Sequence, residues 1–289
     1  MVKLGLRTDD DNPHHPARCG SHHLVTPHYC LLPSIVMQGP PIYLASDAHL
    51  GAASPETEQA FLAWLDFCGT EASRVVINGD LFDFWFEYGS VIPRGHTRVL
   101  GALSALVDSG VPVLLMGGNH DWWGGTYLTD EIGVEFLREP TVLNLGGNNT
   151  LLAHGDGLGS GDLGYRLLRF VFRGAPTRFL FRWLHPDAGA WIARRVSKTG
   201  THPGGQSEKH KVRSEILERW ASDQLSSSPE LDLVVLGHTH VPVLKEVFPG
   251  RYYLNAGDWL VNRSYGVLSR EGPPRLMFWR DGAPSEADG

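Results

Sequence analysis

The sequence has few of the features that mark several common protein classes. It contains only three cysteines, in no regular spacing, which argues against both a disulfide framework and a cysteine-based metal site. No apolar run reaches the roughly 18–20 residues that a membrane-spanning helix needs, and the N-terminus lacks the apolar core of a secretory signal. The 25 basic residues are outnumbered by 32 acidic ones, whereas nucleic-acid-binding proteins usually have a basic surface. We therefore expect a cytoplasmic protein with no nucleic-acid partner.

The sequence does contain enough apolar residues for one large domain. A chain of 289 residues, 42% of them hydrophobic, can bury one sizeable core. We expect this core in residues 41–280, with a helical cap insert at residues 160–225. Residues 1–40 are rich in His and Pro without a helix or strand period, which predicts a disordered N-terminal extension with no catalytic role. Residues 281–289 are expected to be a frayed tail.

Five polar blocks stand out because each follows a short apolar run. The runs are rich in Val, Ile and Leu and have the length of buried strands. They are Ile42–Ala45, Val75–Ile77, Val111–Met116, Leu151–Ala153 and Leu231–Leu236, and the blocks after them are Asp47-Ala48-His49, Gly79-Asp80, Gly118-Asn119-His120-Asp121, His154-Gly155-Asp156 and Gly237-His238-Thr239-His240. Since ligands of an open α/β sheet bind beyond the carboxyl ends of its strands, we expect the blocks to converge at one sheet edge.

Seven side chains of these blocks predict a site for two metal ions. They are two Asp, four His and one Asn, a set suited to Mn²⁺, Fe²⁺, Zn²⁺ or Mg²⁺. Seven are too many for one ion that keeps a position open, but two ions about 3.5–4 Å apart that share a carboxylate would use them all. Any single block could instead cap a helix or face solvent. The occurrence of five such blocks in series favours the metal site.

Further helices and strands are predicted around this edge. Apolar residues at helical spacing predict two helices that cover the sheet, Glu56–Cys68 and His96–Asp108, and Ser54 before Pro55 suits a helix start. Three runs predict strands of a second sheet, namely Arg251–Asn255, Tyr265–Leu268 and Arg275–Trp279.

The order of the blocks, D-x-H, G-D-x-x-D, G-N-H-D, H-G-D and G-H-T-H, resembles that of the calcineurin-like metallophosphoesterases over residues 42 to about 280. The resemblance implies an α/β fold, a four-layer α/β/β/α sandwich, around two divalent metal ions. It also implies the ligands. The first ion would be held by Asp47, His49, Asp80 and His240. The second would be held by Asp80, Asn119, His154 and His238, so that Asp80 bridges the two.

The resemblance also implies the chemistry. Water activated by the two metals attacks phosphorus in line, and the ions absorb the charge that develops on the phosphoryl oxygens, so no protein nucleophile is needed. His120 would point at the phosphate or the leaving oxygen, and Asp121 would orient its ring. Asp83 follows Asp80 closely and would contact the ligands rather than the metals.

Three longer stretches resemble a narrower family, UDP-2,3-diacylglucosamine diphosphatase of lipid A synthesis. They are Gly79–Tyr88, His154–Tyr165 and Asn255–Trp259. The resemblance implies hydrolysis of the pyrophosphate of UDP-2,3-diacylglucosamine to UMP and the diacylated sugar 1-phosphate, commonly with Mn²⁺, in a Gram-negative bacterium. The sequence departs from the best-known branch of that family, which has Arg where His120 stands, and agrees with a branch that keeps the His.

The cap insert combines apolar, aromatic and basic residues. Between Asp162 and Val196 the apolar spacing predicts two or three short amphipathic helices, and another helix is expected at about Ser207–Leu225 after a flexible loop, Thr199–Ser207. From Tyr165 to Trp220 there are twelve Lys or Arg against four acidic residues. Such helices could receive acyl chains, grip a diphosphate and rest on the inner-membrane surface, or could form a satellite subdomain with an aromatic core of its own.

The family resemblance favours the substrate-binding cap. It implies substrate contacts from the insert as well as from Asn119 and His120 at the metal edge. The implied residues of the insert are Asp162, Tyr165, Arg194 and Arg195.

Two other functions stay open at this point. A metallophosphoesterase for another nucleotide diphosphate or phosphodiester would keep the seven ligands and show no dependence on acyl chains. A catalytically silent scaffold would usually have lost ligands, whereas all seven are present here together with His120.

Overall fold

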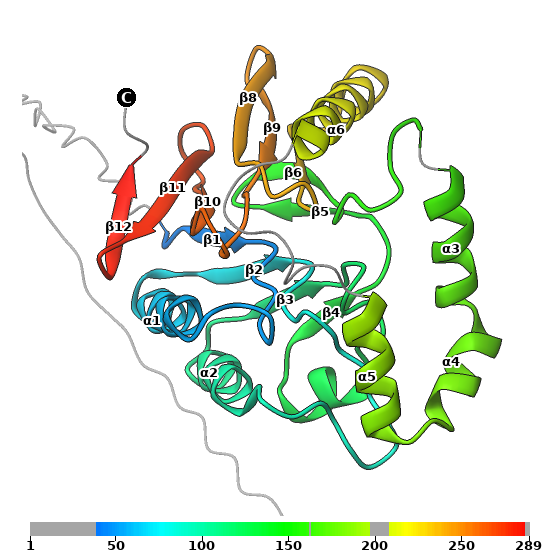
Figure 1. The fold of residues 1–289 in the computed structure, drawn as a ribbon. Helices are drawn as coiled ribbons and strands as arrows, with labels where there is room; N and C mark the ends of the chain where they lie inside the picture. The colour runs from blue at the N-terminus through cyan, green and yellow to red at the C-terminus, as the bar shows by residue number, and fades with distance from the viewer. Residues whose placement is uncertain (1–38, 162, 197–207, 287–289) are drawn as a thin grey trace, which may run out of the picture. The chain divides into compact units, whose positions relative to one another are not determined.

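The computed structural model describes residues 39–161, 163–196 and 208–286. Two mixed sheets lie face to face with helices on both outer faces, which confirms the expected α/β/β/α layers (Figure 1). The expected N-terminal extension lies outside the described residues except for residues 39 and 40, and so does the expected loop Thr199–Ser207.

The first sheet has seven strands in the order β12-β11-β10-β1-β2-β3-β4. Strands β1 to β4 run parallel, and β10, β11 and β12 continue the sheet antiparallel from β1. The bounds are β1 Ile42–Ala45, β2 Arg74–Asn78, β3 Val113–Met116, β4 Glu135–Leu137, β10 Ser264–Leu268, β11 Arg275–Arg280 and β12 Ala283–Glu286.

The position of β10 and β11 corrects two predictions. Both strands were expected in the second sheet, because alternation shows that a strand has a buried face but not which sheet it joins. Their aromatic residues favour the first sheet, because they pack beneath its helices. Tyr265 packs on Tyr43, and Trp279 packs on Phe67. Strand β12 also occupies part of the segment that was expected to be a frayed tail.

The second sheet has five strands in the order β5-β6-β7-β9-β8. Strands β6, β7 and β9 run parallel, and β5 and β8 are antiparallel edge strands. The bounds are β5 Thr141–Leu145, β6 Asn148–Leu152, β7 Leu233–Leu236, β8 Val243–Phe248 and β9 Arg251–Asn255. The five apolar runs that precede the polar blocks are therefore divided between two sheets, β1 to β3 in one and β6 and β7 in the other.

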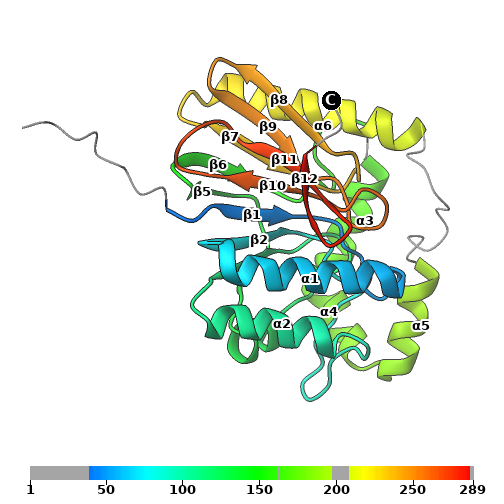
Figure 2. The same ribbon diagram turned by 90° about the vertical axis from the view of Figure 1, so that its left-hand side faces the viewer.

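Three clusters of apolar side chains hold the sandwich together. Figure 2 shows the layers that they join, with helices on both outer faces of the sheets. Between the sheets, residues of β1 to β3 such as Leu44 pack against residues of β6, β7 and β9 such as Val235. Helices α1 (Pro55–Glu71) and α2 (Thr97–Asp108) cover the outer face of the first sheet. The predicted start of α1 is confirmed, because Ser54 Oγ accepts a hydrogen bond of 3.2 Å from the Thr57 N–H.

Helix α6 (Glu208–Ser227) covers the outer face of the second sheet, where Leu217, Ala221 and Leu225 are buried against β7 and β9. Helix α6 occupies the C-terminal part of the expected cap insert, residues 160–225, and packs on the second sheet. The three shorter helices are α3 (Leu163–Arg173), α4 (Ala175–Arg182) and α5 (Pro186–Val196), called the insert helices below. Among the described residues, no helix is both long enough and apolar enough to cross a bilayer.

The core beneath α1 provides a stability test. Trp64 is fully buried, and its ring lies 5.2 Å from that of Trp259 and 5.7 Å from that of Tyr265. We expect Trp64→Ala to lower the free energy of unfolding by about 3–5 kcal/mol in chemical denaturation. The matched control Trp183→Ala, at a side chain that is 76% exposed, should change it by less than about 0.5 kcal/mol. Equal losses in the two variants would contradict this packing.

Candidate metal centre

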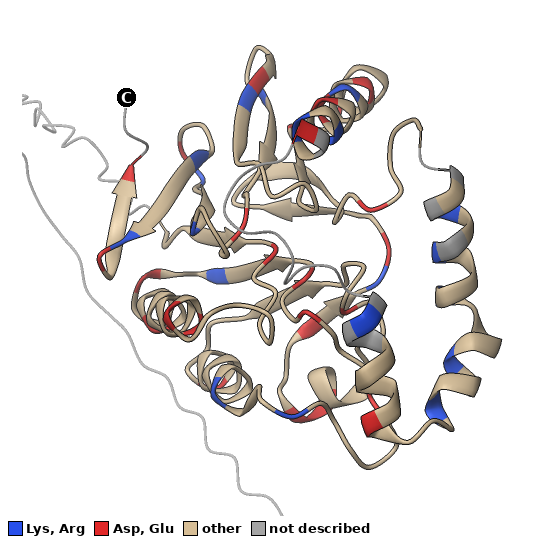
Figure 3. Ribbon diagram, in the orientation of Figure 1, with Lys and Arg blue, Asp and Glu red and all other residues tan. Residues whose placement is uncertain are grey.

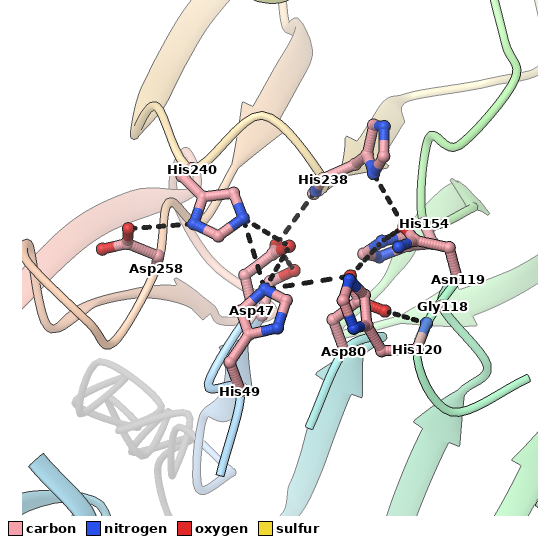
Figure 4. A network of polar contacts seen from close by, with 12 residues as sticks. Asp47, His49, Asp80, Gly118, Asn119, His120, His154, His238, His240 and Asp258 are labelled. Carbon is pink, nitrogen blue, oxygen red and sulfur yellow. Dashed lines mark hydrogen bonds and ion pairs between the residues drawn. The ribbon is translucent and has the colours of Figure 1, made fainter. Parts of the chain in front are cut away.

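The polar blocks form tight turns directly after their strands, and most of the predicted ligands have an unusual backbone conformation there. Side chains other than Gly rarely adopt a positive φ, and when they do the strain is often associated with function. Here φ is 53° at Asp47, 45° at His49, 52° at Asp80, 68° at His238 and 59° at His240. These turns direct the five side chains toward a common region at the carboxyl ends of both sheets (Figure 4).

One group of side chains surrounds the Asp47 carboxylate. Asp47 Oδ1 lies 3.8 Å from His49 Nε2 and 3.6 Å from His240 Nε2. The two Nε2 atoms are 3.3 Å apart, and His49 Nε2 is 3.8 Å from Asp80 Oδ2. Asp47, His49 and His240 thus bring one ligand atom each within 4.8 Å of one another, and Asp80 approaches this group at His49.

A second group begins at the same Asp80 carboxylate. Asp80 Oδ2 lies 3.2 Å from His154 Nε2, which lies 3.3 Å from Asn119 Oδ1. Asn119 Oδ1 in turn is 2.9 Å from His238 Nδ1. Asp80 therefore stands between the two groups.

The donor atoms fit two divalent ions. The ligand atoms of Asp47, His49 and His240 lie within 4.8 Å of one another, and so do those of Asp80, His154 and His238; metal–ligand bonds of about 2.0–2.2 Å bring ligand atoms into proximity of this order. Asp47 Oδ1 is buried and has no hydrogen-bond partner among the described residues. A buried carboxylate oxygen without a partner is costly, and a metal ion would satisfy it.

Hydrogen bonds from the far side of the ring orient two of the histidines. His154 Nδ1 donates to the Asn78 carbonyl at 2.8 Å, and His240 Nδ1 donates to Asp258 Oδ2 at 3.1 Å. Because Nδ1 is held in this way, the Nε2 atom of each of these two rings faces the other proposed metal ligands, as ligand histidines require. Sequence reasoning gave Asn78 and Asp258 no role. Asn78 acts through its backbone, which leaves no signal in the sequence, whereas Asp258 belongs to the stretch Asn255–Trp259 that carries the narrower family resemblance.

Two glycines allow the carboxylates to approach the neighbouring chain. A Cβ at Gly118 would overlap Asp80 Oδ1, and a Cβ at Gly237 would overlap Ser46 Oγ and come within 2.7 Å of Asp47 Oδ2. Neither position requires a positive φ, so the absence of a side chain is what matters. The Gly of G-N-H-D and the Gly of G-H-T-H are thus part of the construction of the site.

The structure gives Asp121 a different place from the expected one. It was expected to orient the His120 ring, but His120 Nδ1 donates to the Asp83 carbonyl at 2.7 Å and lies 3.7 Å from Asp83 Oδ1. The Asp121 carboxylate instead accepts the backbone N–H groups of Leu81 at 2.7 Å and Gly118 at 2.8 Å. Asp121 therefore ties together the turns that carry Asp80 and Asn119, and Asp83 contacts the histidines.

Burial and opposite charges shift the pKa values of the group. Burial alone would lower the pKa of His154, but the Asp80 carboxylate raises it well above its usual value. Burial would likewise lower the pKa of His240, which the hydrogen bond to Asp258 raises. Burial lowers the pKa of His238 to about 3 and also lowers that of His49. Despite burial, His154 and His120 hold the pKa of Asp80 well below its usual value.

The structure describes only part of the substrate contacts that were expected in the insert. Asp162 lies outside the described residues, and the side chains of Tyr165 in α3 and Arg194 in α5 are likewise not described. Arg195 is exposed and lies over the Trp191 ring, 5.2 Å from its centre. A residue that no motif indicated, His210 of α6, stacks on His240 at 5.8 Å with 11° between the ring planes.

Comparison with known proteins agrees with the fold and the site. Residues 40–242 match the family described as calcineurin-like phosphoesterase. The chain belongs to this family. With the His and Asp clusters in place, it is a metal-dependent phosphoesterase.

Relatives with named activities cover most of the chain. A UDP-2,3-diacylglucosamine hydrolase of Porphyromonas gingivalis is 35% identical over 246 residues, which is 78% of this chain and 93% of that protein. A protein of the same name from Pseudomonas putida is 30% identical, covering 75% of this chain and 90% of its own length. Among solved structures, Vps29 of Chaetomium thermophilum aligns with a TM-score of 0.42 at 12% identity, over 83% of this chain and 86% of that one.

The pKa shifts predict that metal binding depends on pH. Because His154 and His240 have raised pKa values, they hold protons in the metal-free protein to a higher pH than free imidazole does. A metal ligand must lose its proton, so Mn²⁺ affinity should fall as pH is lowered, and binding should release protons. Calorimetric titrations in buffers of different ionisation enthalpy measure that release. An affinity independent of pH with no proton release would contradict the assignment.

Proposed function

We propose that the protein hydrolyses the pyrophosphate bond of UDP-2,3-diacylglucosamine, yielding UMP and 2,3-diacylglucosamine 1-phosphate. The relatives that carry this name and the two metal-ligand groups support the proposal. The observation that carries it is the exposed apolar surface of the insert helices next to those groups. A phosphoesterase for a small soluble ester has no use for such a surface.

The apolar side chains of the insert helices are unusually exposed. Phe170 of α3 is 78% exposed, and Phe179, Leu180 and Trp183 around α4 are each more than 60% exposed. Contiguous exposed apolar groups mark binding sites for apolar ligands, membranes or partners. A satellite subdomain, the alternative interpretation of the insert, would bury these side chains in its own core.

The insert is attached beside the metal-ligand turns. The Phe181 ring of α4 lies 4.7 Å from Phe86 and 5.0 Å from Trp123, which follow the blocks of Asp80 and Asn119 in sequence. Trp123 Nε1 also donates to the Phe172 carbonyl at 3.1 Å. One substrate molecule could therefore place an acyl chain on the insert helices and its phosphate at the metal-ligand groups.

Basic residues on the insert helices favour an anionic membrane surface as the setting. Figure 3 shows basic residues along α4, and Arg178 and Arg182 of this helix are exposed. Exposed apolar and basic residues together bind the interface of anionic membranes. We therefore place the protein in the cytoplasm, peripherally bound to the inner membrane through the insert, with the UDP-linked diacylated lipid as its substrate.

The metal ligands are assigned from the two groups. Asp47, His49, Asp80 and His240 would hold the first ion, and Asp80, Asn119, His154 and His238 the second, with Mn²⁺ as the expected metal. When bound, two such ions act as Lewis acids toward phosphoryl oxygens and lower the pKa of a bound water.

His120 and Asn119 complete the site. The bond from His120 Nδ1 to the Asp83 carbonyl fixes the ring, and the ring's Nε2 lies 4.0 Å from Asp80 Oδ2. From there Nε2 can donate a hydrogen bond to a phosphoryl or leaving oxygen. Tyr165, Asp162, Arg194 and Arg195 remain the proposed substrate contacts of the insert.

The substrate is tested with the Mn²⁺-loaded protein. We expect UMP release from UDP-2,3-diacylglucosamine, and little or no hydrolysis of UDP-N-acetylglucosamine or bis-p-nitrophenyl phosphate, because only the first has acyl chains for the insert. Hydrolysis of the two small controls without hydrolysis of the lipid would refute the substrate and leave a phosphoesterase of other specificity.

The shared carboxylate is tested by Asp80→Asn. We expect turnover to fall more than about 100-fold, because even residues that only contact metal ligands are worth about 10–100-fold. The matched control Asp66→Asn, on the exposed side of α1, should keep wild-type turnover. An Asp80→Asn protein with wild-type turnover, after contaminating phosphatase is excluded, would rule out the bridging role.

A further inference from the structure

The turn that carries His154 is held by arginines from outside the metal edge. His154 is followed by a loop in which Gly155, Gly157 and Gly159 all have positive φ, before the chain enters α3 (Figure 1). The loop also touches the turn of His238, because the His154 carbonyl accepts the Gly237 N–H at 2.7 Å. A displacement of the loop would therefore move two ligands of the second group.

Helix α3 presents three arginines to this loop, at positions 166, 169 and 173 on one face. Arg173 Nη2 lies 2.8 Å from Asp156 Oδ2, and Arg169 Nη1 lies 3.4 Å from the same oxygen. Arg169 also donates to the Asp156 carbonyl, and Arg166 Nε donates to the Gly157 carbonyl at 2.9 Å. These guanidinium groups contact protein, although the sequence had suggested that the basic residues of the insert grip a diphosphate.

The ion pair at Asp156 is largely shielded from solvent. The Asp156 residue is 4% exposed, and the Arg173 side chain is 14% exposed. Removing one partner from a buried pair leaves the other charge uncompensated, so the contact is a strong constraint on the loop. Asp156 lies only two residues after His154.

Helix α6 also contacts this loop, from another side. Arg213 Nη2 donates to the Leu158 carbonyl at 2.7 Å and Arg213 Nη1 to the Ser160 carbonyl at 3.3 Å. A Cβ at Gly159 would come within 2.6 Å of Ile216, and one at Gly157 within 3.2 Å of Arg169. The alternating glycines of H-G-D-G-L-G thus let the two helices close on the backbone.

We propose that Arg173 and Arg169 are positioning residues for the second metal ion, acting through Asp156 on His154 and His238. The insert helices then have two tasks, to contact substrate and to set the geometry of half of the metal centre. This role rests on the proposed function, because it requires two bound metal ions. It does not require these arginines to touch the substrate.

Metal binding without substrate tests the proposal. Metal-free protein is titrated with Mn²⁺, and free Mn²⁺ is read from its electron paramagnetic resonance signal. Wild type should bind two ions. In Arg173→Leu the affinity for one ion should fall about tenfold, within the 10–100-fold range of residues that support metal ligands, while the other ion binds as before. Asp156→Asn, which keeps the shape of the side chain and removes its charge, should weaken the same single ion.

The control is Arg219→Leu, because Arg219 is exposed on α6 and donates to a carbonyl of its own helix. It should bind both ions as wild type does. Unchanged affinities in folded Asp156→Asn, or an equal loss in Arg219→Leu, would overturn the positioning role even if Arg173→Leu does not fold. Wild-type protein that binds fewer than two ions would overturn the proposed function itself.

Discussion

The Asp80 carboxylate lies between the two groups of proposed metal ligands, and its surroundings depend on the packing of the two sheets. It follows β2 of the first sheet, whereas His154, which lies 3.2 Å from its Oδ2, follows β6 of the second. The apolar layer between the sheets, with Leu44 and Val76 on one side and Leu152 and Val235 on the other, sets their relative position. A slide of one sheet over the other would separate Asp80 from His154 and His238 while leaving each turn intact.

Bringing two carboxylates and several imidazoles into one buried region is costly, and the local structure shows how the cost is met. Five of the side chains stand on left-handed backbone, a conformation worth about 1–3 kcal/mol of strain at each non-Gly residue. The strain persists because surrounding contacts fix the turns. Asp121 accepts N–H groups from two of them, and Asp258 and the Asn78 carbonyl hold two of the rings. The proposed ligands are thus preorganised by groups outside the ligand set.

Much of this arrangement could be predicted from the sequence, for reasons that are local. Short runs of Val, Ile and Leu that end in polar blocks predicted β1, β2, β3, β6 and β7, and the order of the blocks predicted the family and the layered fold, both of which are confirmed. Long-range pairing could not be predicted in this way. The alternation in β10 and β11 does not say that β10 joins β1 and β11 joins β10, and the apolar stripe of α6 does not say that a sheet covers it. Contacts made through backbone atoms, such as those of Asn78 and the loop after His154, leave no pattern of side chains to recognise.

The most direct test of this account is anomalous diffraction at the manganese absorption edge from crystals grown with Mn²⁺. The account predicts two peaks about 3.5–4 Å apart, one among Asp47, His49 and His240, the other among Asn119, His154 and His238, with Asp80 between them. A single peak, or peaks away from these side chains, would contradict it.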